Sequence, residues 1–269
     1  MKIRNLAMGI TTILAISSVV GHAQSSNNGV DPYRFERINQ HNFTSQGWIE
    51  QEVLSPSGLP QVFLDESEHL KIVCGPENDS DPRLIKGSIT MDLPTTAFPT
   101  LRRIRLRRAG YSGTYLADLT ELKYSTYLVH GGATVMVLQV DMNGDAAKDF
   151  NIFYAPEDQG TDPPVALNIW QQWDALHGVW GVEASTIPGF SNGTELTLEE
   201  LIERFPAARI IDTPPIGHNG EGVRFTVGGG PTPSTYFDNV SYFDALIIGT
   251  TSRPRSTLFD FTCDSSDQN

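Results

Sequence analysis

The sequence predicts an all-β fold, a sandwich or a barrel, with one short helix. Three observations lead to this prediction. Short runs rich in β-branched and aromatic residues recur between Gly, Pro, Asn and Asp along most of the chain. Two of these runs flank the dipeptide Asn143–Gly144, which is a strong hairpin signal. In addition, one segment shows the apolar period of a helix.

The first residues have the layout of a secretory signal. Lys2 and Arg4 precede an apolar run that is too short and too broken by Thr and Ser to span a membrane, and the small residues Gly21 and Ala23 follow it. We therefore expect residues 1–23 to be a signal peptide and the protein to be exported, in an extracellular or cell-surface location.

After the signal, we expect a disordered or extended lead-in over residues 24–45 and a single β-sandwich domain over 46–265. The β-rich runs within that domain follow one another at the spacing typical of sandwiches and barrels. They are residues 47–54, 60–65, 69–75, 86–93, 100–108, 118–129, 133–141, 150–156, 165–176, 178–185, 207–212, 222–230, 239–249 and 256–263.

The helical segment interrupts this pattern near residue 200. Thr197 can cap a helix while Glu200, three residues later, reaches back to the cap. Four apolar residues between Leu198 and Phe205 then fall on one face, and Pro206 ends the helix. We expect one short helix that packs against a sheet.

Composition limits the partners. The chain has 32 Asp and Glu against 19 Lys and Arg, a formal net charge of −13. Such a surface repels nucleic acid and anionic lipid, which both require neutralising cations. No second apolar segment is long enough for membrane insertion. Neutral ligands and divalent cations remain compatible with the charge.

The two cysteines, Cys74 and Cys263, lie near opposite ends of the predicted domain. In an oxidising compartment an even number suggests a disulfide, and chain-entropy arguments give a bridge over so long a loop roughly 4–5 kcal/mol of stabilisation at most. The alternative is a pair of buried free thiols.

The hairpin around Asn143 is the strongest candidate for a metal site. Asp141, Asn143, Asp145 and Asp149 occupy positions 1, 3, 5 and 9 of the loop, the spacing of the first ligands in calcium loops. Position 12, where an EF-hand has Glu, is Ile152. Because Asp and Asn also favour turns without metal, the segment is either a structural calcium site or a bare hairpin.

Aromatic residues supply the candidate ligand-binding side chains, since sugars stack on aromatic rings. From the pool of Trp and Tyr residues we select Trp180, which lies beside two glycines and is the better candidate for an exposed ring, together with Tyr111 and Tyr154. For any single one of these residues, packing in the core is the alternative that we favour. Trp170 and Trp173, three apart, point to opposite faces of a strand, so at least one belongs to the core.

The basic run "TLRRIRLRR" sends Arg103, Arg105 and Arg107 to one face of a strand. It is either a strip for anionic glycans or, as we favour, a solvated sheet face paired with acidic residues.

Several blocks also resemble secreted bacterial β-sandwich domains, and the last two are similar to the final strands of jelly-roll carbohydrate-binding modules. These blocks are "YLADLTELKYSTY", "LNIWQQWDALHGVWGVE", "TLEELIERFPAARI", "GVRFTVGGG", "YFDNVSY" and "LFDFT". The resemblance covers about residues 60–262 and implies a jelly-roll-like antiparallel β-sandwich.

The leading functional hypothesis is an extracellular binding module for a polysaccharide or other glycan, and an enzyme is the less favoured interpretation. One alternative is a polysaccharide lyase or glycoside hydrolase on the same fold, for which we assign no catalytic residue. Another is a structural surface or matrix protein without a small ligand. A binder should present exposed aromatics on one face, whereas an enzyme should present a cleft with clustered carboxylates or Tyr, His and Arg.

Overall fold

The structure of the protein is a computed structural model that describes residues 31–54, 70–78, 84, 86–93, 101–160, 165–183, 185, 187, 190–212, 222–228 and 239–263. From Pro32 onward the described residues belong to one compact unit. The predicted signal peptide lies outside the described residues.

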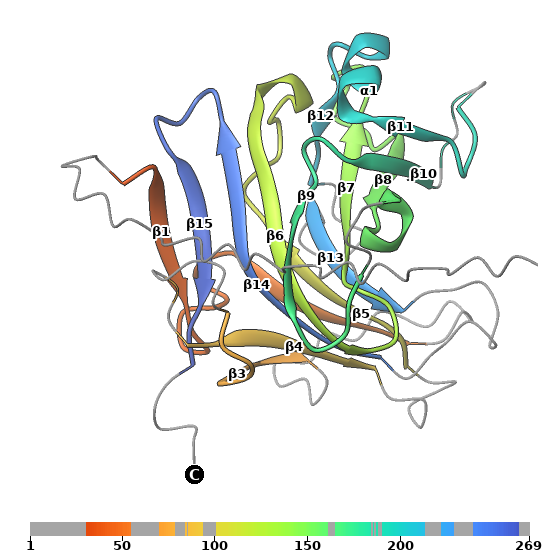
Figure 1. Ribbon diagram of the computed structural model, residues 1–269. Helices are drawn as coiled ribbons and strands as arrows, with labels where there is room; N and C mark the ends of the chain where they lie inside the picture. Colours follow the sequence, from red (N-terminus) through yellow and green to blue (C-terminus); the bar gives the residue numbers. More distant parts are fainter. Residues whose placement is uncertain are drawn as a thin grey trace, which may run out of the picture. The chain divides into compact units, whose positions relative to one another are not determined.

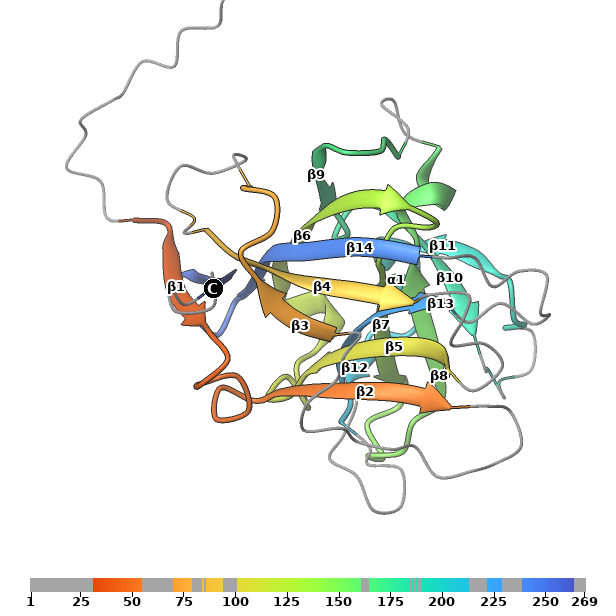
Figure 2. The ribbon, with the colours of Figure 1, turned by 90° about the horizontal axis from the view of Figure 1, so that it is seen from below.

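Within these ranges, seven strands form the first sheet (Figure 1). In hydrogen-bonded order they are β1 (Tyr33–Ile38), β15 (Ser256–Phe261), β14 (Asn239–Thr250), β4 (Ser88–Leu93) and β3 (Leu70–Val73), with β6 (Leu119–His130) paired to β14 and β9 (Trp170–Asp174) paired to β6. Figure 2 shows β4 between β14 and β3, and β3 lies at the edge of this sheet.

The second sheet has eight strands in the same part of the chain. They are β11 (Glu195–Thr197), β10 (Val179–Glu183), β8 (Phe150–Tyr154), β7 (Val135–Asp141), β13 (Val223–Gly228), β5 (Leu101–Arg108) and β2 (Trp48–Leu54), with β12 (Arg209–Ile210) paired to β7. Two 3₁₀ turns, η2 (Leu116–Asp118) and η3 (Pro156–Gln159), lie in the connections.

The two sheets pack face to face through apolar side chains that alternate with outward ones. Tyr124 of β6 and Phe243 of β14 meet Phe225 of β13, with ring centroids 5.6 Å and 4.3 Å from Phe225. These rings join the two sheets because all three are buried. The predicted all-β class and the two-sheet, sandwich-like arrangement are confirmed, and the jelly-roll connection order stays a prediction.

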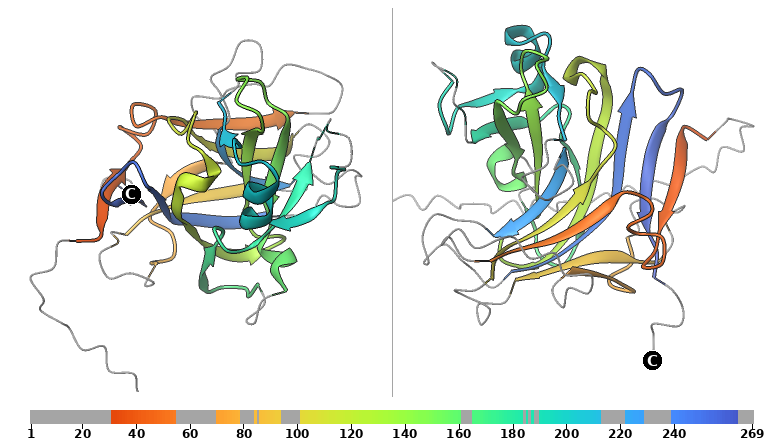
Figure 3. Two further views of the ribbon diagram at one scale, coloured as in Figure 1. Left: turned by 90° about the horizontal axis from the view of Figure 1, so that it is seen from above. Right: turned by 180° about the vertical axis from the view of Figure 1, so that it is seen from behind.

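The predicted helix is confirmed as α1 (Leu198–Arg204). Thr197 Oγ1 accepts from the Glu200 N–H, and the Glu200 carboxylate accepts from the Thr197 N–H, which is the expected capping box. Leu198 and Leu201 are buried and Phe205 packs against the core. Figure 3 shows the helix at one end of the unit, following β11.

The predicted disulfide is also confirmed. Cys74, which follows β3, is bonded to Cys263, which follows β15, with 5.2 Å between their Cα atoms. The bridge joins residues 189 apart in sequence and ties the first sheet's β3 edge to the end of β15.

Strand β1 lies in the segment that we expected to be a disordered or extended lead-in. Residues Tyr33–Ile38 are extended, and they pair in parallel with Ser256–Phe261 while the other pairings of the described strands are antiparallel. The first sheet therefore begins before residue 46.

The basic run of β5 alternates between two faces as expected, but its arginine face is not the solvated surface that we favoured. Ile104 and Leu106 are in the core, as expected. On the other face Arg107 is completely buried and Arg105 nearly so, so this face is not solvated at these positions.

Candidate functional site

The three aromatic residues selected from the sequence lie in the core. Trp180 is 0% exposed, Tyr111 2% and Tyr154 3%. The Trp180 Nε1–H donates to the Ala175 carbonyl at 2.8 Å. Burial raises the pKa of Tyr154 to about 12, with a smaller contribution from the Asp174 carboxylate. Trp180, the better candidate for an exposed ring, is therefore buried, and none of the three rings offers a surface for stacking.

The glycines beside Trp180 explain the error. A Cβ on Gly178 would lie 2.2 Å from Cε2 of Tyr154, and a Cβ on Gly181 would lie 2.3 Å from Cζ of Phe153. These two positions are glycine because aromatic rings of β8 pack directly on the backbone there. The glycines thus allow tight packing around Trp180 instead of exposing it.

The Asp-rich segment forms the expected hairpin between β7 and β8. The buried Asp141 carboxylate accepts from the N–H groups of Gly144 (2.7 Å) and Ala146 (2.9 Å), and from the Arg209 guanidinium of β12 (2.9 Å). Burial by itself would raise the pKa of Asp141, but these hydrogen bonds and the guanidinium hold it below its ordinary value.

The other carboxylates of the hairpin also accept from protein donors. Asp149 accepts from the Met142 N–H at 2.7 Å, and Asp145 accepts from the Ala147 N–H at 2.8 Å. No group of three or more His, Cys, Asp or Glu among the described residues is placed to hold a metal ion. A calcium ion at Asp141 would have to displace the Arg209 guanidinium from the carboxylate. The calcium site stays a prediction.

The outer face of the first sheet instead brings three partly exposed aromatic side chains together. Tyr242 (β14) is directly opposite Tyr127 (β6), and Tyr127 is directly opposite Trp170 (β9). Ring centroids are 5.9 Å apart for the tyrosine pair and 5.7 Å apart for Tyr127 and Trp170. We call these three residues the aromatic row.

The aromatic row must face away from the core because of strand alternation. Phe243 is a core residue, so its neighbour Tyr242 points outward, and Tyr127 lies an odd number of positions from the core residue Tyr124. The line of residues across the sheet continues through Thr90 of β4, which is the register partner of Tyr242, and then through Lys71 of β3, which is the register partner of Thr90. Across five strands it spans about 19 Å at the usual strand spacing.

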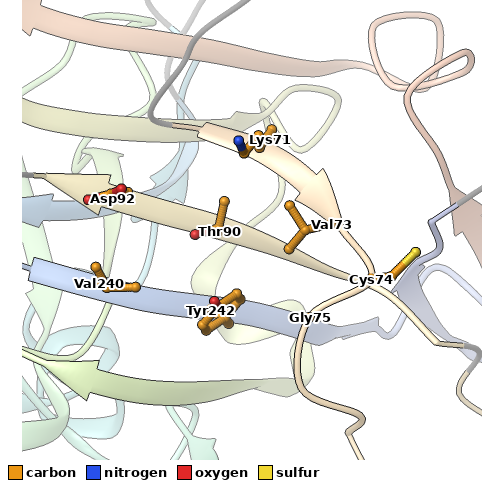
Figure 4. A pocket seen from close by; sticks show the side chains of 8 residues that line it. All are labelled: Lys71, Val73, Cys74, Gly75, Thr90, Asp92, Val240 and Tyr242. Atoms are coloured by element: carbon orange, nitrogen blue, oxygen red, sulfur yellow. The ribbon is translucent and has the colours of Figure 1, made fainter. Parts of the chain in front are cut away.

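A groove of about 360 Å³ lies at the Tyr242 end of the row. Figure 4 shows that its lining comes from three neighbouring strands and the segment that follows β3. The lining residues are Lys71, Val73, Cys74, Gly75, Thr90, Asp92, Val240 and Tyr242.

The segment after β3 forms one wall of this site, and we call residues 74–78 the wall segment. Its beginning is fixed by the disulfide at Cys74, and the Trp170 Nε1–H donates to the Pro76 carbonyl at 3.2 Å. A Cβ on Gly75 would come within 2.9 Å of the Tyr242 ring, so glycine allows the wall to pass close to the row.

The wall segment is also joined to a buried carboxyl group on the same face of β14. Asn78 Nδ2 donates to Asp244 at 3.2 Å, and the Phe261 N–H donates to the other Asp244 oxygen at 3.1 Å. Burial raises the pKa of Asp244 to about 8 and the nearby Asp260 carboxylate adds to the rise, although these hydrogen bonds oppose it. Asp244 is therefore mostly protonated at neutral pH.

Sequence reasoning placed Trp170 in the aromatic pool but missed Tyr127 and Tyr242. The spacing of three between Tyr124 and Tyr127 indicates opposite faces, and Tyr242 alternates with the apolar Phe243. Neither signal says which strands are neighbours, and the row exists only because β14, β6 and β9 are adjacent.

No family model, curated protein or solved structure matches this chain. In the described part of the chain, no helix has the length and apolar character needed to cross a membrane.

Proposed function

We propose that this chain is an exported carbohydrate-binding module that holds a polysaccharide or oligosaccharide on the outer face of its first sheet. The observation that carries the proposal is the aromatic row, three partly exposed rings on adjacent strands that lead into a groove with polar side chains. The resemblance of the closing strands to jelly-roll carbohydrate-binding modules points the same way.

The physical basis is the two-sided character of a pyranose ring. Its C–H faces stack on aromatic rings, while its hydroxyl groups need hydrogen-bond partners at the edge. The aromatic row offers rings for stacking, and the side chains of Thr90, Asp92 and Lys71 offer hydrogen-bond partners. Because the rings stand on hydrogen-bonded strands, little conformational entropy is lost when a ligand binds.

The surroundings of the row support a ligand surface. Leu167 and Ile169, which precede Trp170 by three residues and by one, are 55% and 51% exposed, so exposed apolar side chains lie next to the start of β9. The disulfide supports the export part of the proposal, since such bonds persist in oxidising compartments.

The test is affinity electrophoresis of the exported chain against a panel of soluble polysaccharides, followed by calorimetry on any that retard it. We expect Tyr127→Ala and Tyr242→Ala each to weaken binding about tenfold, the loss of one stacked ring. Trp170→Phe keeps an aromatic ring but loses the hydrogen bond to the Pro76 carbonyl. This variant therefore distinguishes the contribution of stacking from that of the wall segment's position.

Tyr115→Ala is the matched control, because Tyr115 is 44% exposed and lies outside the aromatic row. It should bind like the original chain. The proposal is wrong if no polysaccharide retards the protein, or if Tyr115→Ala weakens binding as much as the row variants do. Release of sugar fragments during the assay would favour the enzyme alternative.

A further inference from the structure

The groove beside Tyr242 contains two charged side chains of opposite sign. Lys71, on β3, is exposed, and Asp92, on β4, is half-buried. Neither forms a salt bridge or side-chain hydrogen bond with another residue in the described part of the chain. As far as the described residues go, their ammonium and carboxylate groups are available to a ligand that enters the groove.

The position of the groove makes it the end of the aromatic row. Lys71 is the register partner of Thr90, and Thr90 is the register partner of Tyr242. Asp92 is the partner of Val240, which lies two residues from Tyr242 on the same face. A ligand stacked on Tyr242 would thus have Lys71 and Asp92 at its edge and not beneath it.

One side of the groove is closed. Cys74 and Gly75 line it, and the wall segment is anchored by the disulfide and by Trp170. A fixed wall beside an aromatic floor restricts how a ring can be oriented, so the charged groups meet a defined edge of the ligand.

The charges limit which ligand fits. One cation and one anion leave the groove with no net charge, so a singly charged sugar gains from one group and is repelled by the other. The chain's net charge of −13 further disfavours an anion. A neutral sugar meets no such repulsion, and its hydroxyl groups offset the desolvation of both charges, because a carboxylate accepts from two adjacent hydroxyl groups and an ammonium group donates to sugar oxygens.

We infer that the groove formed by Lys71, Thr90, Asp92 and Tyr242 is a subsite for one neutral pyranose unit, and that it selects neutral glycans over uronate-containing or amino-sugar polymers. This inference rests on the proposed function, because it assigns a specificity to one end of the same surface.

The experiment compares three soluble polymers: a neutral hexose polysaccharide retained by the original chain, polygalacturonate and chitosan. At a salt concentration that screens the attraction between the acidic chain and the cationic chitosan, we expect only the neutral polymer to bind. Asp92→Asn and Lys71→Met should each weaken that binding about 10-fold or more, since each removes a charge-assisted hydrogen bond. Asp92→Asn leaves a net positive groove and should gain affinity for polygalacturonate relative to the neutral polymer.

Asp158→Asn and Lys148→Met are the matched controls, because both positions are exposed and neither lines the groove. Circular dichroism and melting temperature show whether each variant folds. Absence of any glycan binding refutes the proposed function itself. Binding that requires Tyr127 but is unchanged by Asp92→Asn and Lys71→Met refutes only the subsite, as does a preference of the original chain for polygalacturonate or chitosan.

Discussion

Asp244 allows a direct test of the electrostatics beneath the candidate site. Its side chain is completely buried on β14, and burial raises its pKa from an ordinary value near 3.8 to about 8. The replacement Asp244→Asn keeps the shape of the side chain and removes its proton equilibrium. Asn78, which donates to Asp244 at 3.2 Å, can rotate its amide to accept from the new side chain.

The sign of the effect follows from the raised pKa. Between about pH 4 and pH 8 the folded protein holds one proton on Asp244 that the unfolded chain has released, so the original chain loses stability as pH rises through this window. One proton is worth a little over 1 kcal/mol per pH unit, so the loss is roughly 2–3 kcal/mol between pH 5 and pH 7. The Asn variant does not bear this cost.

Urea unfolding at pH 5, 6 and 7, followed by tryptophan fluorescence, measures the effect. We expect the stability of Asp244→Asn relative to the original chain to rise by about 2–3 kcal/mol over these two pH units. Asp158→Asn, which alters an exposed carboxyl, should show no such rise. A difference for Asp244→Asn that is the same at pH 5 and pH 7 would show that Asp244 is already ionised in the folded protein.

Three further substitutions test other parts of the structure, each by urea unfolding. Arg209→Ala removes the guanidinium from the buried Asp141 carboxylate and should lower the free energy of unfolding by about 1.5–3 kcal/mol. If calcium then stabilises this variant more than it stabilises the original chain, the hairpin can bind the ion. Replacement of Cys74 and Cys263 by Ser should cost up to about 4–5 kcal/mol, and a reductant should destabilise only the original chain. Gly181→Ala places a Cβ 2.3 Å from the Phe153 ring of β8 and should lower the free energy of unfolding by about 1–3 kcal/mol. An unchanged urea midpoint would contradict the packing of Phe153 on Gly181.

The features that could be predicted from sequence are those that local signals decide. The helix depends on Thr197 and Glu200, which are three residues apart and cap one turn. The Asn143–Gly144 hairpin is equally local. The disulfide spans most of the chain, but two cysteines allow only one intramolecular pairing.

The predictions that were wrong concern features that depend on which strands are neighbours. The glycines beside Trp180 indicated exposure, yet they exist because Tyr154 and Phe153 from another strand pack on them. Arg107 was expected on a solvated face and is completely buried. Alternation along one strand gives the two faces of a sheet but not what covers each face, so neither the buried arginine nor the aromatic row could be located in advance.

The parallel pairing of β1 with β15 also determines how the protein carries mechanical tension. Tyr33 is opposite Ser256 and Ile38 is opposite Phe261, so the two strands run in the same direction. A pull applied before Tyr33 and after Cys263 draws the strands past each other and loads their hydrogen bonds together, in shear, instead of opening them one at a time. The disulfide at Cys263 passes part of that force to β3. A chain tethered on both sides of this unit would therefore resist stretching at β1 and β15 before its aromatic row is disturbed.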